Sequence, residues 1–212
     1  MTTYKVYAKN KKEENSLLEF LKKTGIKSKV PSRPNNQKKG KAFEKEISKE
    51  LSLWWSIGKR DDIFYCTAGS GSRFTSRKKR GNDTANSCGD LSYTDSDGKP
   101  FMDRFSVELK NGYSDSLDLL SIIDSENKNH MLMEWVTKAK KEIEEAGREQ
   151  FLIIFKRDRK NKVVCIDSRF LEQLDNEFRP DKELLLYLPD MAISVIDYDV
   201  FFKHFSPADL LK

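Results

Sequence analysis

Glu108 and Lys110 are a pair of residues whose types and spacing could support chemistry. They lie in segment 101–110, where apolar and polar side chains alternate from Phe105 onward. Alternation is the period of a strand with one buried face, so the two side chains project from the same side. Glu108 could hold a divalent cation, and Lys110 could hold an oxyanion or orient a water molecule.

A second carboxylate precedes this expected strand. Asp90 follows Gly89, and segment 95–100, which is rich in turn-forming residues, separates it from the strand. Two strands joined by such a turn would place Asp90 near Glu108. An Asp followed on the next strand by Glu-x-Lys indicates a metal-dependent nuclease site.

The bare acid-x-Lys triplet is not specific in this chain. Glu126–Lys128 and Asp158–Lys160 match it as well. Both lie in polar segments that lack alternating apolar partners to hold their side chains in place. The strand pattern and the preceding Gly-Asp distinguish Glu108 and Lys110 from these two triplets.

Positive charge is concentrated at the start of the chain. Residues 1–45 hold 13 Lys and Arg against 4 Glu, a net charge of +9, which leaves −4 for the rest of a chain whose total is +5. A basic arm on a slightly acidic body suggests a polyanionic partner, and a solvated leader is the alternative. We expect a basic arm with a short helix over residues 1–36, and one domain with a C-terminal extension over residues 37–212.

The cysteines and the hydropathy pattern narrow the class of protein. Cys66, Cys88 and Cys165 are far apart, without Cys-x-x-Cys or a paired His, so neither a zinc site nor a disulfide framework is indicated. No apolar run approaches the ~20 residues of a membrane span. The first residues lack the apolar core of a signal peptide. We therefore expect a cytoplasmic protein with reduced thiols and no membrane association.

Segment 41–56 has helical spacing, with Phe43, Ile47 and Leu51 on one side. Glu44 lies beside this stripe, near the expected first turn. A Glu in a first turn favours the helix dipole and needs no other role. The acidic pair downstream nevertheless lacks a third oxygen ligand, which Glu44 could supply.

A short apolar strand, Ile63–Cys66, leads into the glycine-containing segment Ala68–Gly71. Residues 73–86 form a long polar segment with several cations and no acid before Asp83. Loops of this length in compact domains are usually functional or disordered. We interpret it as a mobile basic loop over a phosphate backbone, with a merely solvated loop as the alternative.

The second half of the chain predicts a crossover unit. Met131–Ala146 is the clearest helix, with Gly147 as its C-cap and Lys138 beside its apolar stripe. Phe151–Phe155 then fits a buried strand parallel to the first one. Further strands are predicted at 163–166, 183–188 and 192–197, with a helix at 168–174. Phe201, Phe202 and Phe205 are expected to close the core.

Taken together, these motifs resemble the PD-(D/E)xK nuclease superfamily, and within it the archaeal-type Holliday junction resolvases. The matching residues are Gly40 and Glu44 at the start of the first helix, Ala68–Gly71 after the first strand, Asp90, and Glu108 with Lys110. The resemblance covers roughly residues 38–155. The chain departs from the resolvase pattern by a basic insertion between Gly71 and Gly89 and by its two extensions.

The resemblance implies an α/β fold of restriction-endonuclease type, with a mixed central sheet flanked by helices. It implies a DNA endonuclease that uses Mg²⁺ or Mn²⁺. The cation ligands would be Asp90, Glu108, Glu44 and the backbone carbonyl of Leu109, with Lys110 as the catalytic lysine and Lys138 as a further residue facing the site. The expected DNA-binding residues are Lys38, Lys39, Lys41, Ser70, Arg73, Arg77, Lys78, Lys79 and Arg80.

Several alternatives stay open from the sequence. A sequence-specific restriction-type enzyme is the runner-up to a junction or branch cutter, and the DNA partner could be branched or duplex. A non-catalytic nucleic-acid-binding protein on the same fold would use the basic arm equally well. Three buried charged groups without a metal would be costly, which argues against it. A homodimer is compatible with the sequence.

Overall fold

The computed structural model describes residues 11–24, 36–67, 80, 88–112, 130–188 and 190–212. The chain divides into two compact units, residues 1–35 and residues 36–212. The described part of the first unit is one helix, α1 (Lys11–Lys23), on which Phe20 is exposed. Among the described residues, no helix has both the length and the apolar character needed to cross a membrane.

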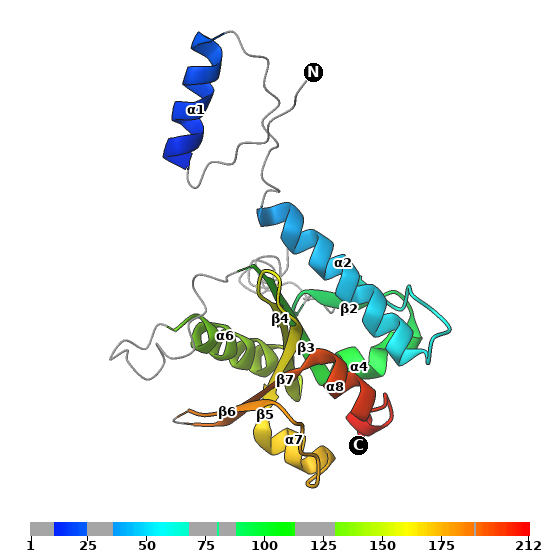
Figure 1. The fold of residues 1–212 in the computed structure, drawn as a ribbon. Coiled ribbons are helices and arrows are strands. Elements are labelled where there is room, and N and C mark those ends of the chain that lie inside the picture. The colour runs from blue at the N-terminus through cyan, green and yellow to red at the C-terminus, as the bar shows by residue number, and fades with distance from the viewer. Residues whose placement is uncertain (1–10, 25–35, 68–79, 81–87, 113–129, 189) are drawn as a thin grey trace. The chain divides into compact units, whose positions relative to one another are not determined.

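The second unit alternates between helices and strands (Figure 1). Its elements up to the central crossover are α2 (Asn36–Trp55), β1 (Phe64–Cys66), β2 (Leu91–Tyr93), η1 (Ser96–Gly98), α4 (Lys99–Arg104), β3 (Phe105–Asn111), α6 (Met131–Ala146) and β4 (Gln150–Lys156). The remaining elements are β5 (Lys162–Asp167), α7 (Ser168–Leu174), β6 (Glu183–Tyr187), β7 (Ala192–Asp197), α8 (Tyr198–His204) and η2 (Asp209–Leu211).

A five-stranded sheet in the order β3-β4-β5-β7-β6 forms the centre of this unit. β3 and β4 are parallel, as the predicted crossover through α6 requires, and the other neighbours are antiparallel. The predicted mixed α/β architecture with flanking helices is therefore confirmed.

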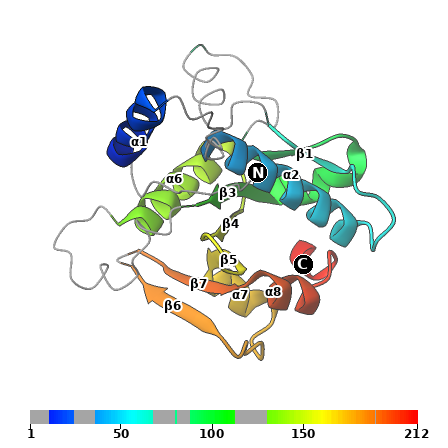
Figure 2. The ribbon, with the colours of Figure 1, turned by 45° about the horizontal axis from the view of Figure 1, so that its top comes forward.

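The two faces of the sheet are covered by different helices. On β4, Leu152 and Ile154 join the hydrophobic cluster that contains residues of α2, α7 and α8, while Phe151 and Ile153 join the cluster of α6. Both views show β3 and β4 running between α2 and α6 (Figures 1 and 2). Because β4 is covered on both sides, its sequence is a continuous apolar run rather than an alternating one.

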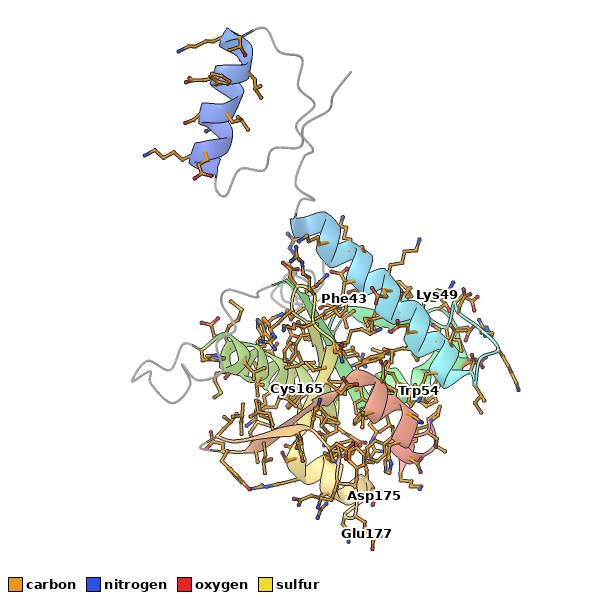
Figure 3. All side chains as sticks on the ribbon, viewed as in Figure 1. Phe43, Lys49, Trp54, Cys165, Asp175 and Glu177 are labelled. Atoms are coloured by element: carbon orange, nitrogen blue, oxygen red, sulfur yellow. The ribbon has the colours of Figure 1, made fainter. Side chains whose placement is uncertain are left out.

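Helix α2 packs through its apolar stripe and is tied to the end of the chain. Phe43 is 2% exposed, whereas Lys49 lies on the outer side of the helix (Figure 3). Trp54 donates a hydrogen bond from Nε1 to the carbonyl of Phe205 at 3.1 Å, and its ring meets Phe202 edge to face. Phe201, Phe202 and Phe205 are all buried, which confirms that they close the core.

The strand expected over residues 101–110 begins only at Phe105, because residues 99–104 form the helix α4. Pro100 lies in the first turn of α4, where its missing N–H costs nothing. Phe101 and Met102, although adjacent, are both buried in the same cluster. A strand would send them to opposite faces, whereas a helix brings both into one core.

The expected hairpin between Asp90 and Glu108 is also wrong. β2 pairs antiparallel with β1, in a separate two-stranded sheet, and η1 and α4 fill the connection to β3. Gly98 allows the tight packing at this point, since a Cβ there would lie 2.7 Å from the Cβ of Tyr93. The link between Asp90 and β3 is therefore made by other contacts.

Helix α2 begins at Asn36, five residues before the expected start. Residues 36–40, which precede the predicted helix, are thus helical as well. Helix α6 has the predicted bounds, and Gly147 caps it in the left-handed conformation with φ of +66°. All three cysteines are free thiols, and Cys165 lies at the centre of the packed side chains (Figure 3).

Candidate active site

Asp90 is held against β3 by its main chain and by its side chain. Its N–H donates to the carbonyl of Val107 at 2.7 Å, and the N–H of Leu109 donates to its Oδ2 at 2.7 Å. Asp90 is only 5% exposed. The expected proximity of Asp90 to the Glu-x-Lys segment is present, although no hairpin produces it.

Gly89 makes this close approach possible. Its φ is +75°, and a Cβ at this position would lie 2.5 Å from the carbonyl oxygen of Val107 and 3.0 Å from its nitrogen. Both the backbone conformation and the lack of space exclude a larger residue. The Gly-Asp pair is thus a structural requirement for placing the Asp90 carboxylate beside β3.

Glu108 and Lys110 project from the α6 face of β3, whereas Val107 and Leu109 belong to the cluster on the other face. Glu108 is 1% exposed, and Lys110 contacts it directly through an ion pair. The ammonium group of Lys110 also lies 3.7 Å from Oδ2 of Asp90. The three residues predicted from the sequence therefore form one largely buried cluster.

Helix α6 adds two charged side chains to this cluster. Nζ of Lys138 lies 3.3 Å from Oε1 of Glu108 and 3.3 Å from Oε1 of Glu142. Glu142 is 6% exposed, and its Oε2 is buried without a hydrogen-bond partner in the described part of the chain. The structure places Lys138 at the site, as the sequence predicted.

Glu142 is not among the site residues that the sequence predicts, although the sequence holds a signal for its position. The buried positions of α6 are Leu132, Val136, Ala139 and Glu142. The sequence pattern instead predicts an apolar stripe of Met131, Trp135, Ala139, Ile143 and Ala146. Position 142 follows Ala139 by three residues and Lys138 by four, so it lies on the sheet-facing side. An acid at an inward position of an amphipathic helix, four residues after a Lys, marks a candidate for the site.

Opposing effects set the ionisation of the two buried glutamates. Burial alone raises the pKa of Glu108, but the ammonium groups of Lys110 and Lys138 hold this pKa below its ordinary value. Burial, followed by the nearby charge of Glu108, raises the pKa of Glu142 to about 7. Glu108 is thus the ionised carboxylate of the pair, and Glu142 holds its proton more tightly.

Glu44 approaches the cluster from α2, on the other side of the sheet. Burial and the charge of Asp90 raise its pKa, and Lys110 opposes this shift. If Gly40 carried a Cβ atom, this atom would lie 4.0 Å from Oε1 of Glu44, an ordinary van der Waals contact. Because α2 begins at Asn36, Glu44 is not in the first turn, and the helix dipole does not account for it.

The acidic side chains offer oxygen ligands, the type that Mg²⁺ and Mn²⁺ prefer. Within the described ranges, no group of three or more His, Cys, Asp or Glu side chains is already arranged to hold a metal ion. Lysine ammonium groups contact Glu108 instead. The site fits a cation in donor type and in charge, provided that an ammonium group moves aside.

Part of the predicted DNA-binding set can be placed. Lys38, Lys39 and Lys41 lie on α2, where Lys41 is exposed and Lys39 forms an ion pair with Asp158 at 3.7 Å. Arg80 is exposed. The other predicted residues, Ser70, Arg73, Arg77, Lys78 and Lys79, fall outside the described residues.

The competing acid-x-Lys triplet at Asp158–Lys160 is an exposed turn between β4 and β5. Arg159 there has φ of +61°, as tight turns allow. The triplet at Glu126–Lys128 falls outside the described residues. A further triplet, Asp97–Lys99, has an exposed acid and an exposed lysine. In the described part of the chain, Glu108 and Lys110 are therefore the acid-x-Lys residues with a buried second carboxylate beside them.

Comparison with known proteins identifies the family of this chain. No curated protein and no solved structure matches the chain. Residues 35–210 match the model of a family described as "Phage putative PDDEXK endonuclease". This match spans the whole second unit apart from its last two residues, including α2, the sheet and α6. Because this match covers more than half of the chain, the chain belongs to this family of phage putative PDDEXK endonucleases.

Proposed function

We propose that this protein is an endonuclease that hydrolyses DNA phosphodiester bonds with the help of Mg²⁺ or Mn²⁺. The observation that carries the proposal is the largely buried cluster of Asp90, Glu108 and Lys110, with Glu44 at its edge. Burial of two carboxylates costs desolvation free energy that their pairing with lysines only offsets, so a functional role accounts for them better than a stabilising one. Membership in the endonuclease family points to the same chemistry.

The carboxylates of Asp90 and Glu108 would hold the cation, with Glu44 and the carbonyl of Leu109 as further oxygen ligands. When bound, such a cation neutralises phosphate charge and lowers the pKa of water. The backbone hydrogen bond from Leu109 to Asp90 fixes the orientation of that carboxylate before the substrate arrives.

Lys110 would act on the reacting phosphate and on the attacking water. Its contacts with both carboxylates support this role, because a phosphate held by a cation on Asp90 and Glu108 would lie close to its ammonium group. There it would orient the water or stabilise the negative charge that develops during attack. Lys39 and Lys41 would contact the phosphate backbone from α2.

As the substrate we propose a junction or another branched DNA. Cleavage of duplex DNA at a specific sequence is the alternative. The support for branched DNA is the Gly40-to-Glu44 spacing in the first half of α2, which resembles that of junction resolvases. Cleavage of both strands of a junction would call for two copies of the site, so a homodimer is part of this proposal.

The test is a cleavage assay on four-way junctions, flaps, linear duplex and single strands, with Mg²⁺, Mn²⁺ or EDTA. We expect cleavage only with a divalent cation, and none by Asp90→Asn under any condition. The matched control is Asp181→Asn, at an exposed position between α7 and β6, which should cleave normally. Undiminished cleavage in EDTA would exclude the carboxylate cation site, and binding without cleavage of any substrate would favour a binding module.

A further inference from the structure

Lys138 reaches the site from α6, and two buried carboxylates share its ammonium group. This group lies 3.3 Å from an oxygen of Glu108 and 3.3 Å from an oxygen of Glu142. The side chain of Lys138 is 50% exposed, whereas the side chains of both carboxylates are at most 8% exposed. A flexible, half-solvated ammonium group therefore occupies the boundary between solvent and two buried acids.

The charges of the site explain why an ammonium group is needed there. Asp90, Glu44, Glu108 and Glu142 supply four carboxylates, and Lys110 and Lys138 supply two cations. With all groups ionised the cluster carries −2, which one divalent cation would neutralise. Without a divalent cation, Glu108 depends on ammonium groups for its counter-charge, because a buried, unpaired carboxylate is strongly disfavoured.

Glu142 offers the ammonium group a second position. Its Oε2 is buried and, among the described residues, has no hydrogen-bond partner. Lys138 and Glu142 are four residues apart on α6, a spacing at which their side chains stay in contact while either one moves. Lys110 pairs with the other oxygen of Glu108, Oε2, so the two ammonium groups hold different oxygens of this carboxylate.

We propose that Lys138 is an exchangeable counter-ion of Glu108. In the metal-free protein its ammonium group neutralises the Glu108 carboxylate. When a divalent cation binds Glu108, the ammonium group moves fully onto Glu142, whose second oxygen receives it. Lys138 is thus a positioning residue that competes with the cation for one carboxylate. This inference rests on the proposed cation site and adds how access to that site is regulated.

The experiment measures thermal unfolding against Mg²⁺ concentration at pH 8 without DNA, in parallel with Ca²⁺. Lys138→Gln should unfold at a lower temperature than the parent without cation, because Glu108 loses a counter-ion. Its half-saturating Mg²⁺ concentration should fall by about fivefold, the scale of a partly exposed ion pair. Lys138→Arg, which keeps the charge, should restore a value near that of the parent.

Glu142→Gln should shift the titration the other way. Gln keeps an oxygen that accepts a hydrogen bond but removes the negative charge, so the displaced ammonium group has no counter-ion and the half-saturating concentration should rise several-fold. This variant also tests the proposal if Lys138→Gln does not fold. The matched control is Lys141→Gln, on the outer side of α6, where the ammonium group pairs with Glu145 at 4.0 Å. Its titration should equal that of the parent.

Two results would overturn the exchange. If Lys138→Gln lowers the unfolding temperature equally with and without cation, Lys138 is only structural. If its half-saturating concentration rises, Lys138 assists cation binding rather than competing with it. In both cases stabilisation of the parent by Mg²⁺, and its loss in Asp90→Asn, would leave the proposed cation site intact. A parent that no divalent cation stabilises would overturn the exchange and the cation site together.

Discussion

Glu108 is a carboxylate almost without solvent contact, and it stays ionised because two lysines reach it from different elements. Buried ion pairs gain little net stability, since the cost of desolvating both partners offsets their attraction. Removal of one partner is costly, however, because the other is left buried without compensation. The residues of this site are therefore coupled, and a change in one affects the stability as well as the chemistry of the others.

Lys110→Ala should reduce single-turnover cleavage by at least about a hundredfold, the scale of losing a positioned catalytic group. It should also lower the free energy of unfolding by about 2 kcal/mol, because Glu108 keeps only Lys138 as a counter-ion. DNA binding should persist. Cleavage is measured well below the unfolding temperature, so that instability does not imitate a catalytic defect.

Lys160→Ala is the matched control, since this Lys lies in the exposed triplet at residues 158–160. It should cleave and unfold like the parent. If Lys110→Ala cuts as fast as the parent while the control fails, the assignment of the catalytic lysine is wrong.

Glu142 should make stability depend on pH between about 4.5 and 7. Its pKa in the folded protein is about 7, above the ordinary value of 4.5. Within this window the folded protein keeps a proton that the unfolded chain has released, so the free energy of unfolding falls as the pH rises. Glu142→Gln removes this proton equilibrium and should flatten the decline. The pH dependence of the free energy of unfolding is measured by urea unfolding in EDTA at pH 5, 6, 7 and 8.

The comparison for this titration is Glu145→Gln, three positions further along α6 on its outer side, which should keep the slope of the parent. A slope that is the same in Glu142→Gln and in the parent would show that Glu142 does not hold a proton in the folded state.

At the scale of elements, the site depends on how the segment before β2 meets β3. β2 is paired with β1, and the backbone contacts of Asp90 with Val107 and Leu109 join this segment to the main sheet. Gly89 sets the distance of this approach. The placement of the first carboxylate is thus decided by one turn rather than by a long strand pairing.

Gly89→Ala should lower the free energy of unfolding by more than about 2 kcal/mol, since it adds left-handed strain to a steric overlap with Val107. Cleavage should fall as well, because Asp90 is moved. Gly147→Ala is the control: its φ is also positive, at +66°, but nothing lies within 4 Å of the added Cβ. It should cost about 1 kcal/mol and leave cleavage normal. Equal losses in the two variants would contradict the steric argument.

At the scale of the whole molecule, the folded domain should keep its stability when the basic residues 1–35 are removed. Both hydrophobic clusters are built from residues from Phe43 onward, and residues 1–35 hold 9 Lys and Arg against 3 Glu. A chain that begins at Asn36 should therefore unfold within about 2 °C of the full chain, since it keeps the entire core. The change is measured by thermal unfolding and by DNA binding over a range of salt concentrations.

DNA binding by this shortened chain should weaken. The slope of log affinity against log salt should decrease by about 0.9 for each DNA phosphate that the arm neutralises in the full chain. Removal of the same residues should not change the cation requirement for cleavage. An unchanged salt slope would show that the arm does not touch the phosphate backbone.

The sequence by itself determined most elements of the domain and most residues of the candidate site. The sequence predicts β4 and β5 near their bounds because short apolar runs are local signals. It predicts α6 at its bounds because the helical period and the Gly147 cap are local signals as well. Asp90, Glu108 and Lys110 were found because Gly-Asp and an alternating Glu-x-Lys strand are local patterns too. Lys138 was placed beside the stripe of α6 by the same helical period.

Only the tertiary structure decided which of several locally allowed arrangements occurs. The sequence predicts a strand over residues 101–110, yet packing of Phe101 and Met102 into one core makes the first part of it a helix. The pairing of β2 with β1, and the position of Glu142 beside Lys138 and Glu108, depend on contacts between residues far apart in the chain. Periodicity within a segment shows that one face is buried. It does not specify which segment covers that face, because the burial free energy is nearly independent of the partner's identity.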